Sequence, residues 1–282
     1  MWPFDRVSVV PVLRFSGTIG MVTPLRPGLS IAELAGPVEK AFHMSKLPAV
    51  AVVVNSHGGS PVQSSLILKR IRQLAAERKK KVHVFCEDVA ASGGYYIALA
   101  GDEIFADASS IIGSIGVISA SFGFVAALGK LGVERRVHTA GASKNILDPF
   151  LPEKIEDVER LKALQGDVHD VFIGAVKDRR SGKLKGPDAE LFSGAFWSAP
   201  RALELGLIDG ISDVRSRMRE LYGDKVRLKA VPLGRGGLIG RLRRLPSTGM
   251  ALSEAPSQVR LALADDLLSA LEARALWSRY GL

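Results

Sequence analysis

The chain has 282 residues, 47% of them hydrophobic and 24% charged, which is enough for one large domain or two small ones with a sizeable core. This composition excludes a disordered or collagen-like chain, and the single cysteine, Cys86, excludes an internal disulfide. No apolar run approaches the roughly 18 residues of a spanning helix, and Pro11 and Arg14 interrupt the N-terminal stretch 7–15. We therefore expect a cytoplasmic or peripheral membrane protein.

The net charge of +9 is concentrated near one end of the sequence. Residues 215–244 contain ten Lys or Arg against two acidic residues, so the rest of the chain is close to neutral. Such a segment favours an anionic neighbour, and peripheral contact with an anionic membrane is expected. No nucleic acid is expected as a partner, because aromatic residues do not alternate with the basic ones. No cofactor is expected, and no cluster of metal ligands is visible.

The predicted elements alternate between strand and helix over most of the chain. β-branched runs predict strands and three-to-four-residue apolar spacing predicts helices, as in a mostly parallel sheet with right-handed crossovers. The predicted strands are 7–17, 48–55, 81–87, 103–107, 115–119, 133–138 and a short one before 211. The predicted helices are 30–44, 61–80, 95–101, 153–181 and one starting at 199, and then a linker over 232–257 and an amphipathic helix over 257–279.

Two of these strands end in similar loops, "SHGG" at 56–59 and "ASGG" at 91–94. Ligands bind at the carboxyl ends of strands in open α/β sheets, and glycines let backbone N–H groups approach a ligand closely. Each loop also precedes a helix N-terminus, which favours negative charge. Donors from the two loops could together hold a carbonyl oxygen as it becomes an oxyanion.

Ser92 lies beside these donors, where a nucleophile would be, although serine is also a common helix N-cap. A serine nucleophile needs a base. Among the five histidines only His57 falls near the proposed site, and no acid is placed to complete a triad with it. Lys144 is the other candidate base, because it follows a predicted strand in a loop of small residues, and an apolar, closed setting would let it lose its proton.

Four stretches resemble the signal peptide peptidase A family of Ser–Lys endopeptidases, which is related in fold to the Clp protease subunit and to crotonases. The serine block at 87–119 is the most specific, and the other three stretches are 55–61, 139–150 and 192–211. The resemblance covers about residues 8–220. It implies an α/β fold of repeated β-β-α spiral units, here with a C-terminal helical extension.

The resemblance also implies roles for individual residues. Ser92 matches the family nucleophile, Lys144 its general base, and Ser114 a serine that orients the lysine amine. Gly59 and Gly93 match the oxyanion donors. His57 stands where the family usually has proline, so either this loop is more flexible or His57, with Gly58, borders the substrate.

These observations predict a serine endopeptidase with a Ser–Lys dyad that degrades small or unfolded peptides such as signal-peptide remnants. The alternatives are a crotonase-like acyl-CoA enzyme, which would need neither the serine nor the lysine, and an inactive membrane-associated scaffold. A homo-oligomer is expected by resemblance, and a neighbouring subunit could complete the substrate groove. We predict a peptidase domain over 1–222, a basic strand and linker over 223–257, and an amphipathic helix over 258–282.

Overall fold

The computed structural model describes residues 8–20, 28–141, 143–233, 274–275 and 277–280. The elements of the first half are β1 (Val9–Ser16), α1 (Ile31–Met44), β2 (Ala49–Ser56), α2 (Pro61–Arg78), β3 (Lys81–Ala91), α3 (Gly93–Ala98), β4 (Glu103–Ala106), β5 (Ile111–Gly113) and α4 (Val125–Leu131). Those of the second half are α5 (Ile155–Arg179), α6 (Asp188–Leu191), β6 (Phe196–Ser198), α7 (Ala199–Glu204), β7 (Gly210–Ile211), α8 (Val214–Tyr222) and β8 (Arg227–Ala230).

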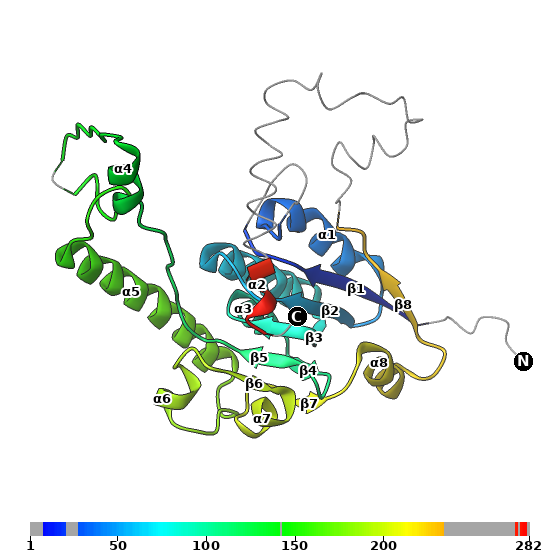
Figure 1. Ribbon diagram of the computed structural model, residues 1–282. Helices are drawn as coiled ribbons and strands as arrows, with labels where there is room; N and C mark the ends of the chain where they lie inside the picture. Colours follow the sequence, from blue (N-terminus) through cyan, green and yellow to red (C-terminus); the bar gives the residue numbers. More distant parts are fainter. Residues whose placement is uncertain (1–7, 21–27, 142, 234–273, 276, 281–282) are drawn as a thin grey trace, which may run out of the picture.

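The strands form one sheet of eight, in the order β6-β5-β3-β2-β1-β8, with β4 paired to β3 and β7 beside β4. Every pairing is parallel except that of β5 with β6. The central strand β2 is buried along almost its whole length, as its continuous β-branched run predicts. This architecture confirms the predicted α/β fold class (Figure 1).

Strand β3 is longer than the predicted 81–87 and pairs with two partners in succession. Its first half pairs with β4 from His83 to Cys86, and its last residues, Val89–Ala91, pair with β5. The strand therefore carries the chain to Ser92 at the carboxyl end of the sheet. β8, which lies in the predicted basic segment, joins the same sheet at β1.

Two apolar clusters cover the two faces of the sheet. The larger cluster packs the inward side chains of β1–β3 against α1, α2 and α3, and it includes Phe42, Ile71 and Tyr95. The smaller cluster lies on the other face, where Met218 of α8 packs against Phe85 and Phe105. Burial on both faces fixes the strand ends that form the site.

Residues 117–154, which we call the arm, extend away from the sheet together with the first turns of α5 (Figure 1). Two strands were predicted near or within this segment, at 115–119 and 133–138, and both predictions are wrong: the arm contains helix α4 and irregular backbone. The valines that suggested the second strand, Val133 and Val137, are 52% and 37% exposed. Without a neighbouring strand or a core to cover them, β-branched residues do not form a strand.

The C-terminal predictions fall mostly outside the described residues. This applies to the linker beyond residue 233 and to most of the predicted helix at 257–279. Residues 277–280 form a helical turn, in which the amide of Tyr280 donates to the carbonyl of Trp277 over 2.9 Å. No helix in the described part of the chain has the length and apolar character needed to cross a bilayer.

Candidate active site

The two glycine loops meet at the carboxyl edge of the sheet because β2 and β3 are parallel neighbours. Ser56, the last residue of β2, pairs with Ala90 near the end of β3. The loops that follow, 57–60 and 92–94, therefore begin side by side. This arrangement brings together the two loops that the sequence predicted as donors.

Ser92 begins α3 in a backbone conformation that few residues other than glycine adopt, with φ 52° and ψ −123°. Its amide donates to the carbonyl of Gly113 over 2.8 Å, and its own carbonyl accepts from Tyr96 over 2.9 Å, so the backbone on both sides is fixed. The Ser92 side chain makes no capping hydrogen bond to α3. The strained backbone and the absent cap favour a functional hydroxyl over a helix cap.

Gly58 lies against Ser92 more closely than any residue with a side chain could. A Cβ on Gly58 would lie 2.9 Å from the Gly93 nitrogen and 3.1 Å from Ser92 Oγ. The next residue, Gly59, has φ +139°, and a Cβ there would lie 2.1 Å from the carbonyl oxygen of Ile19. Only glycines therefore allow this loop to approach the serine.

The backbone of Gly93 lies close to the amide of Gly59, since a Cβ on Gly93 would be 3.3 Å from the Gly59 nitrogen. Among the described residues, neither amide donates a hydrogen bond to the backbone of another loop. Two adjacent, uncommitted N–H groups beside a serine hydroxyl are the arrangement that stabilises an oxyanion.

Ser56 supports the first glycine loop, and the sequence did not single it out. The fully buried Ser56 hydroxyl donates to the carbonyl of Gly17 over 2.6 Å and accepts from the amide of Gly58 over 3.2 Å. It thereby ties the loop to the end of β1. A serine at the end of a buried strand was the only signal that could have indicated this role.

A cavity of about 540 Å³ opens beside Ser92. Five of its lining residues lie in or next to the predicted site: His57, Gly59, Pro61, Ser92 and Ser114. The remaining lining residues are Gly116, Val117, Ile118, His169, Ser193, Gly194, Arg279 and Tyr280.

Ser114 lines the same cavity as Ser92. Its backbone is also in the left-handed region, with φ 51°, and its amide donates to the carbonyl of Ala195 over 2.7 Å. His169 of α5 lies nearby, and its Nε2–H donates to the carbonyl of Ile115 over 3.0 Å. His169 therefore holds the turn after Ser114, a contact between distant segments that no sequence spacing indicated.

His57 is only 5% exposed, and its Nε2 lies 3.2 Å from the hydroxyl oxygen of Thr18. Burial lowers the pKa of His57 from 6.5 to about 4; the nearby Arg279 lowers it slightly further, and a hydrogen bond with the His57 backbone opposes the change. The imidazole is therefore neutral at pH 7. A base with so low a pKa is poorly matched to catalysis near neutrality, which disfavours a His57-based triad.

Lys144 lies in a turn of the arm, where its amide donates to the carbonyl of Gly141 over 3.2 Å. The residue is exposed and does not line the Ser92 cavity. Figure 1 shows the arm extending away from α3. The apolar, closed setting expected for Lys144 is thus absent within a single chain, and the structure does not bring Lys144 to Ser92.

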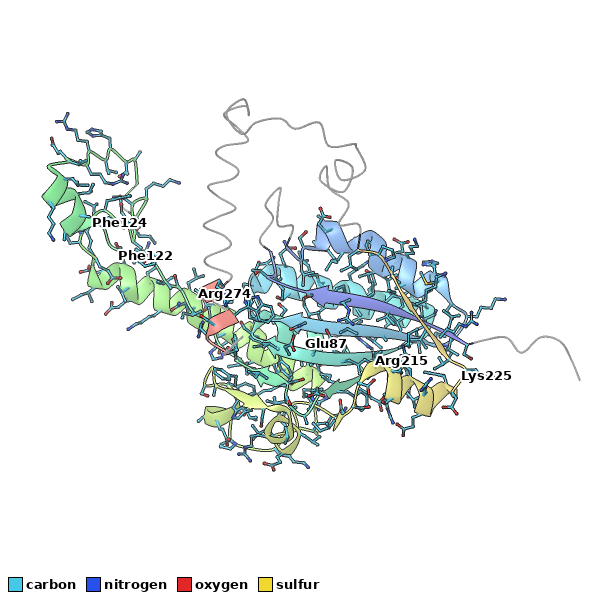
Figure 2. The ribbon with its side chains drawn as sticks, turned by 45° about the vertical axis from the view of Figure 1, so that its right-hand side comes forward. Glu87, Phe122, Phe124, Arg215, Lys225 and Arg274 are labelled. Carbon is cyan, nitrogen blue, oxygen red and sulfur yellow. The ribbon has the colours of Figure 1, made fainter. Side chains whose placement is uncertain are left out.

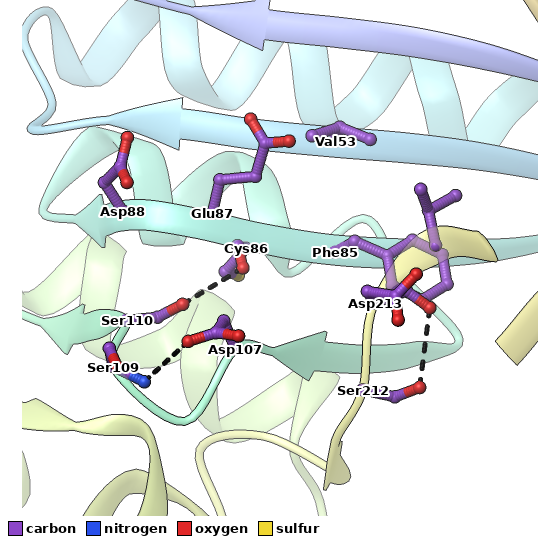
Figure 3. Close-up of a pocket in the computed structure, with 11 residues that line it drawn as sticks. Val53, Phe85, Cys86, Glu87, Asp88, Asp107, Ser109, Ser110, Ser212 and Asp213 are labelled. Atoms are coloured by element: carbon purple, nitrogen blue, oxygen red, sulfur yellow. Dashed lines mark hydrogen bonds between the residues drawn. The ribbon is translucent and has the colours of Figure 1, made fainter. Parts of the chain in front are cut away.

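A second cavity, of about 370 Å³, lies over the face of the sheet that carries the smaller apolar cluster. Four carboxylates are among the residues that line it (Figure 3). Each has a structural partner: Glu87 pairs with an arginine of β1, Asp88 accepts from an asparagine of β2, Asp107 accepts from the amide of Ser109, and Asp213 caps α8. Within the described ranges, no group of three or more His, Cys, Asp or Glu side chains could hold a metal ion.

Comparison with known proteins finds similarity to peptidases. Residues 75–226, just over half of the chain, match the model for peptidase family S49. A Synechocystis protein that bears a protease name is 32% identical over 82% of each chain. The chloroplastic serine protease SPPA of Arabidopsis thaliana is 29% identical over 86% of this chain and 35% of its own length.

A protein of Brucella abortus named Na(+)/H(+) antiporter NhaA is 59% identical over 97% of this chain. The chain spans only 37% of the length of that relative. Among solved structures, a membrane-bound stomatin-specific protease is similar with a TM-score of 0.47 and 16% identity, over 80% of this chain and 98% of that chain.

Proposed function

The chain belongs to peptidase family S49, and from that premise we propose that it is a serine endopeptidase whose nucleophile is Ser92. The observation that carries the proposal is the strained, uncapped Ser92 beside the amides of Gly59 and Gly93. A peptide carbonyl placed in the cavity would meet the hydroxyl and the two donors together. Losing one such donor costs about 3–4 kcal/mol of transition-state stabilisation in other enzymes.

We propose further that Lys144 is the general base and that the arm of another copy of the chain delivers it. In a single chain Lys144 is exposed and outside the Ser92 cavity. The arm exposes large apolar side chains that a second copy could cover, among them Leu131 at 74% and Phe122 at 79%, of which Figure 2 labels Phe122. Burial in such an interface would favour the uncharged amine that a base requires.

The reaction then follows from these groups. The neutral amine of Lys144 takes the proton of the Ser92 hydroxyl while Oγ attacks the peptide carbonyl. The oxyanion is held by the amides of Gly59 and Gly93, and Ser114 orients the amine. The ammonium of Lys144 next protonates the departing amine. A water molecule then attacks the acyl-enzyme while Lys144 accepts its proton, and Lys144 returns this proton to Ser92 Oγ as the ester bond breaks.

The proposed substrates are small or unfolded peptides, including signal-peptide remnants. Such peptides can enter the cavity as extended strands, whereas a folded domain cannot. The proposed contact with an anionic membrane draws on exposed cations of α8 and β8, among them Arg215 and Lys229. The remaining basic residues of 215–244, from Arg235 onward, lie outside the described residues.

The first test is cleavage of denatured proteins and signal-peptide fragments by wild type, Ser92→Ala and Lys144→Ala, followed by mass spectrometry. Both variants should lose cleavage while keeping the fold. Lys130→Ala is the matched control, because Lys130 is an exposed lysine of the same arm and should leave activity unchanged. An active Lys144→Ala enzyme would contradict the dyad.

Mixing the two inactive variants tests where the lysine comes from. A mixed assembly can pair an intact Ser92 in one copy with an intact Lys144 in another, so partial activity should return. No recovery, in subunits shown to exchange, would contradict delivery of the lysine by another copy. Reaction of Ser92 with a fluorophosphonate would count against the inactive scaffold, and tight CoA binding without such reaction would favour the acyl-CoA alternative.

A further inference from the structure

The turn at residues 277–280 lies over the cavity that contains Ser92. Arg279 and Tyr280 line this cavity directly. Trp277 meets the ring of His57 edge-to-face, with centroids 5.1 Å apart. The turn is therefore in contact with the loop that forms one wall of the site. Figure 1 shows this segment, in red, beside α3.

A second aromatic contact holds the other end of the turn. The ring of Tyr280 meets Phe196 of β6, with centroids 5.0 Å apart. His57 follows β2, and β6 is separated from β2 in the sheet by β5 and β3. The turn thus bridges the cavity from one side to the other, with two aromatic side chains three positions apart as its attachments.

The conformation of this segment is unlike that of a bound substrate. Besides the bond from Tyr280 to Trp277, the hydroxyl of Ser278 donates to the carbonyl of Ala275 over 2.9 Å, so the backbone is curled on itself. Peptides bound beside a sheet edge are extended, which presents their carbonyls to the protein. The turn borders the cavity without offering an extended peptide bond to Ser92.

We propose that the 277–280 turn is a reversible cover of the Ser92 cavity that competes with peptide substrates. This inference rests on the proposed peptidase function. His57 supplies the ring against which Trp277 packs, so the device depends on this pair of side chains. The ion pairs among the described residues include none of Arg279, so we assign the hold on the cover to the two aromatic contacts.

The cover should be easy to displace. Edge-to-face ring pairs are individually weak, so removing both attachments by Trp277→Ala and Tyr280→Ala should raise the rate of reaction at Ser92 by about tenfold, equivalent to about 1.4 kcal/mol. The rate is measured as second-order labelling of the full chain by a fluorophosphonate and as peptide cleavage. Arg274→Ala is the matched control, because Arg274 is exposed beside the turn and does not line the cavity (Figure 2).

An NMR titration of His57 tests the cover independently of catalysis at Ser92. In full-length Ser92→Ala protein, the NMR titration of His57 should show a pKa well below 6.5, and Trp277→Ala should move it upward because the ring becomes exposed. An unchanged titration with unchanged labelling would overturn the cover. Absence of labelling in every protein that retains Ser92 would instead overturn the proposed function, and the His57 titration would still decide whether the cover exists.

Discussion

The sharpest prediction concerns His57 and the pH dependence of folding. The pKa of His57 is about 4 in the folded chain and 6.5 when the ring is free in the unfolded chain. The unfolded state therefore binds more protons than the folded state between these values. Stability that is fully present above about pH 6.5 should fall as the pH drops toward 4, and His57 should cause no further loss below that point.

The size of the effect follows from the two pKa values. At pH 5 the ring is almost fully protonated in the unfolded chain and mostly neutral in the folded chain. The pH then lies about 1.5 units below the unfolded value, and each unit is worth about 1.4 kcal/mol. His57 should therefore cost about 2 kcal/mol of unfolding free energy at pH 5 relative to pH 7.

The assay is urea unfolding of wild type and His57→Gln at pH 7 and pH 5, since glutamine occupies similar space and does not titrate. His83, whose pKa is also lowered by burial, contributes equally to both proteins and cancels. Wild type should lose about 2 kcal/mol more than the variant between the two pH values. If both proteins lose the same amount within about 0.5 kcal/mol, the reasoning from burial of His57 is refuted.

Three substitutions away from the reacting atoms test the packing that supports the site, each by urea unfolding at pH 7. Arg180 is 2% exposed and pairs with Asp209 over 2.7 Å, so Arg180→Leu should lower the unfolding free energy by about 3–5 kcal/mol. A loss of less than about 1 kcal/mol would mean that the pair is not buried in solution. Tyr95→Phe removes a buried 2.7 Å hydrogen bond to the carbonyl of Leu207 and should cost about 1–2 kcal/mol; no loss would contradict that bond. Gly94→Ala would place a Cβ 2.3 Å from a backbone oxygen of β2, so it should lower both stability and cleavage, and a variant equal to wild type would show that the two loops are farther apart than described.

Strand β2 and the glycine loop after it could be predicted from sequence because the residue patterns that indicate them are local. The run 48–55 is apolar up to Val54 and became most of the buried strand β2, and the glycines that follow it became the close loop beside Ser92. The strand predictions at 115–119 and 133–138 failed because a strand also needs a neighbouring strand or a core, and the local pattern does not show whether one is present. An apolar pattern indicates that a segment becomes covered, but it does not say whether the cover is the same chain or another copy.

The features of the site also fall into two groups: those that local sequence could predict and those that depend on distant residues. Ser92 and the glycines could be predicted because a turn of small residues after a buried strand constrains the backbone within a few positions. The lowered pKa of His57 could not be predicted, since it arises from burial in the fold and from the charge of Arg279, which is distant in sequence. The contact of His169 with the carbonyl of Ile115 joins segments 54 residues apart and left no trace in the local pattern.

The proposed cover and the proposed delivery of Lys144 act on the same space. Arg279 and Tyr280 line the cavity that the lysine of another copy would have to enter. We infer that the cover and the lysine compete for this space, so each would weaken the binding of the other by the same factor. Assembly of copies through the arm would then open the cover and supply the base in a single equilibrium. An unassembled chain would keep its serine both covered and without a base, which limits peptide cleavage to the assembly.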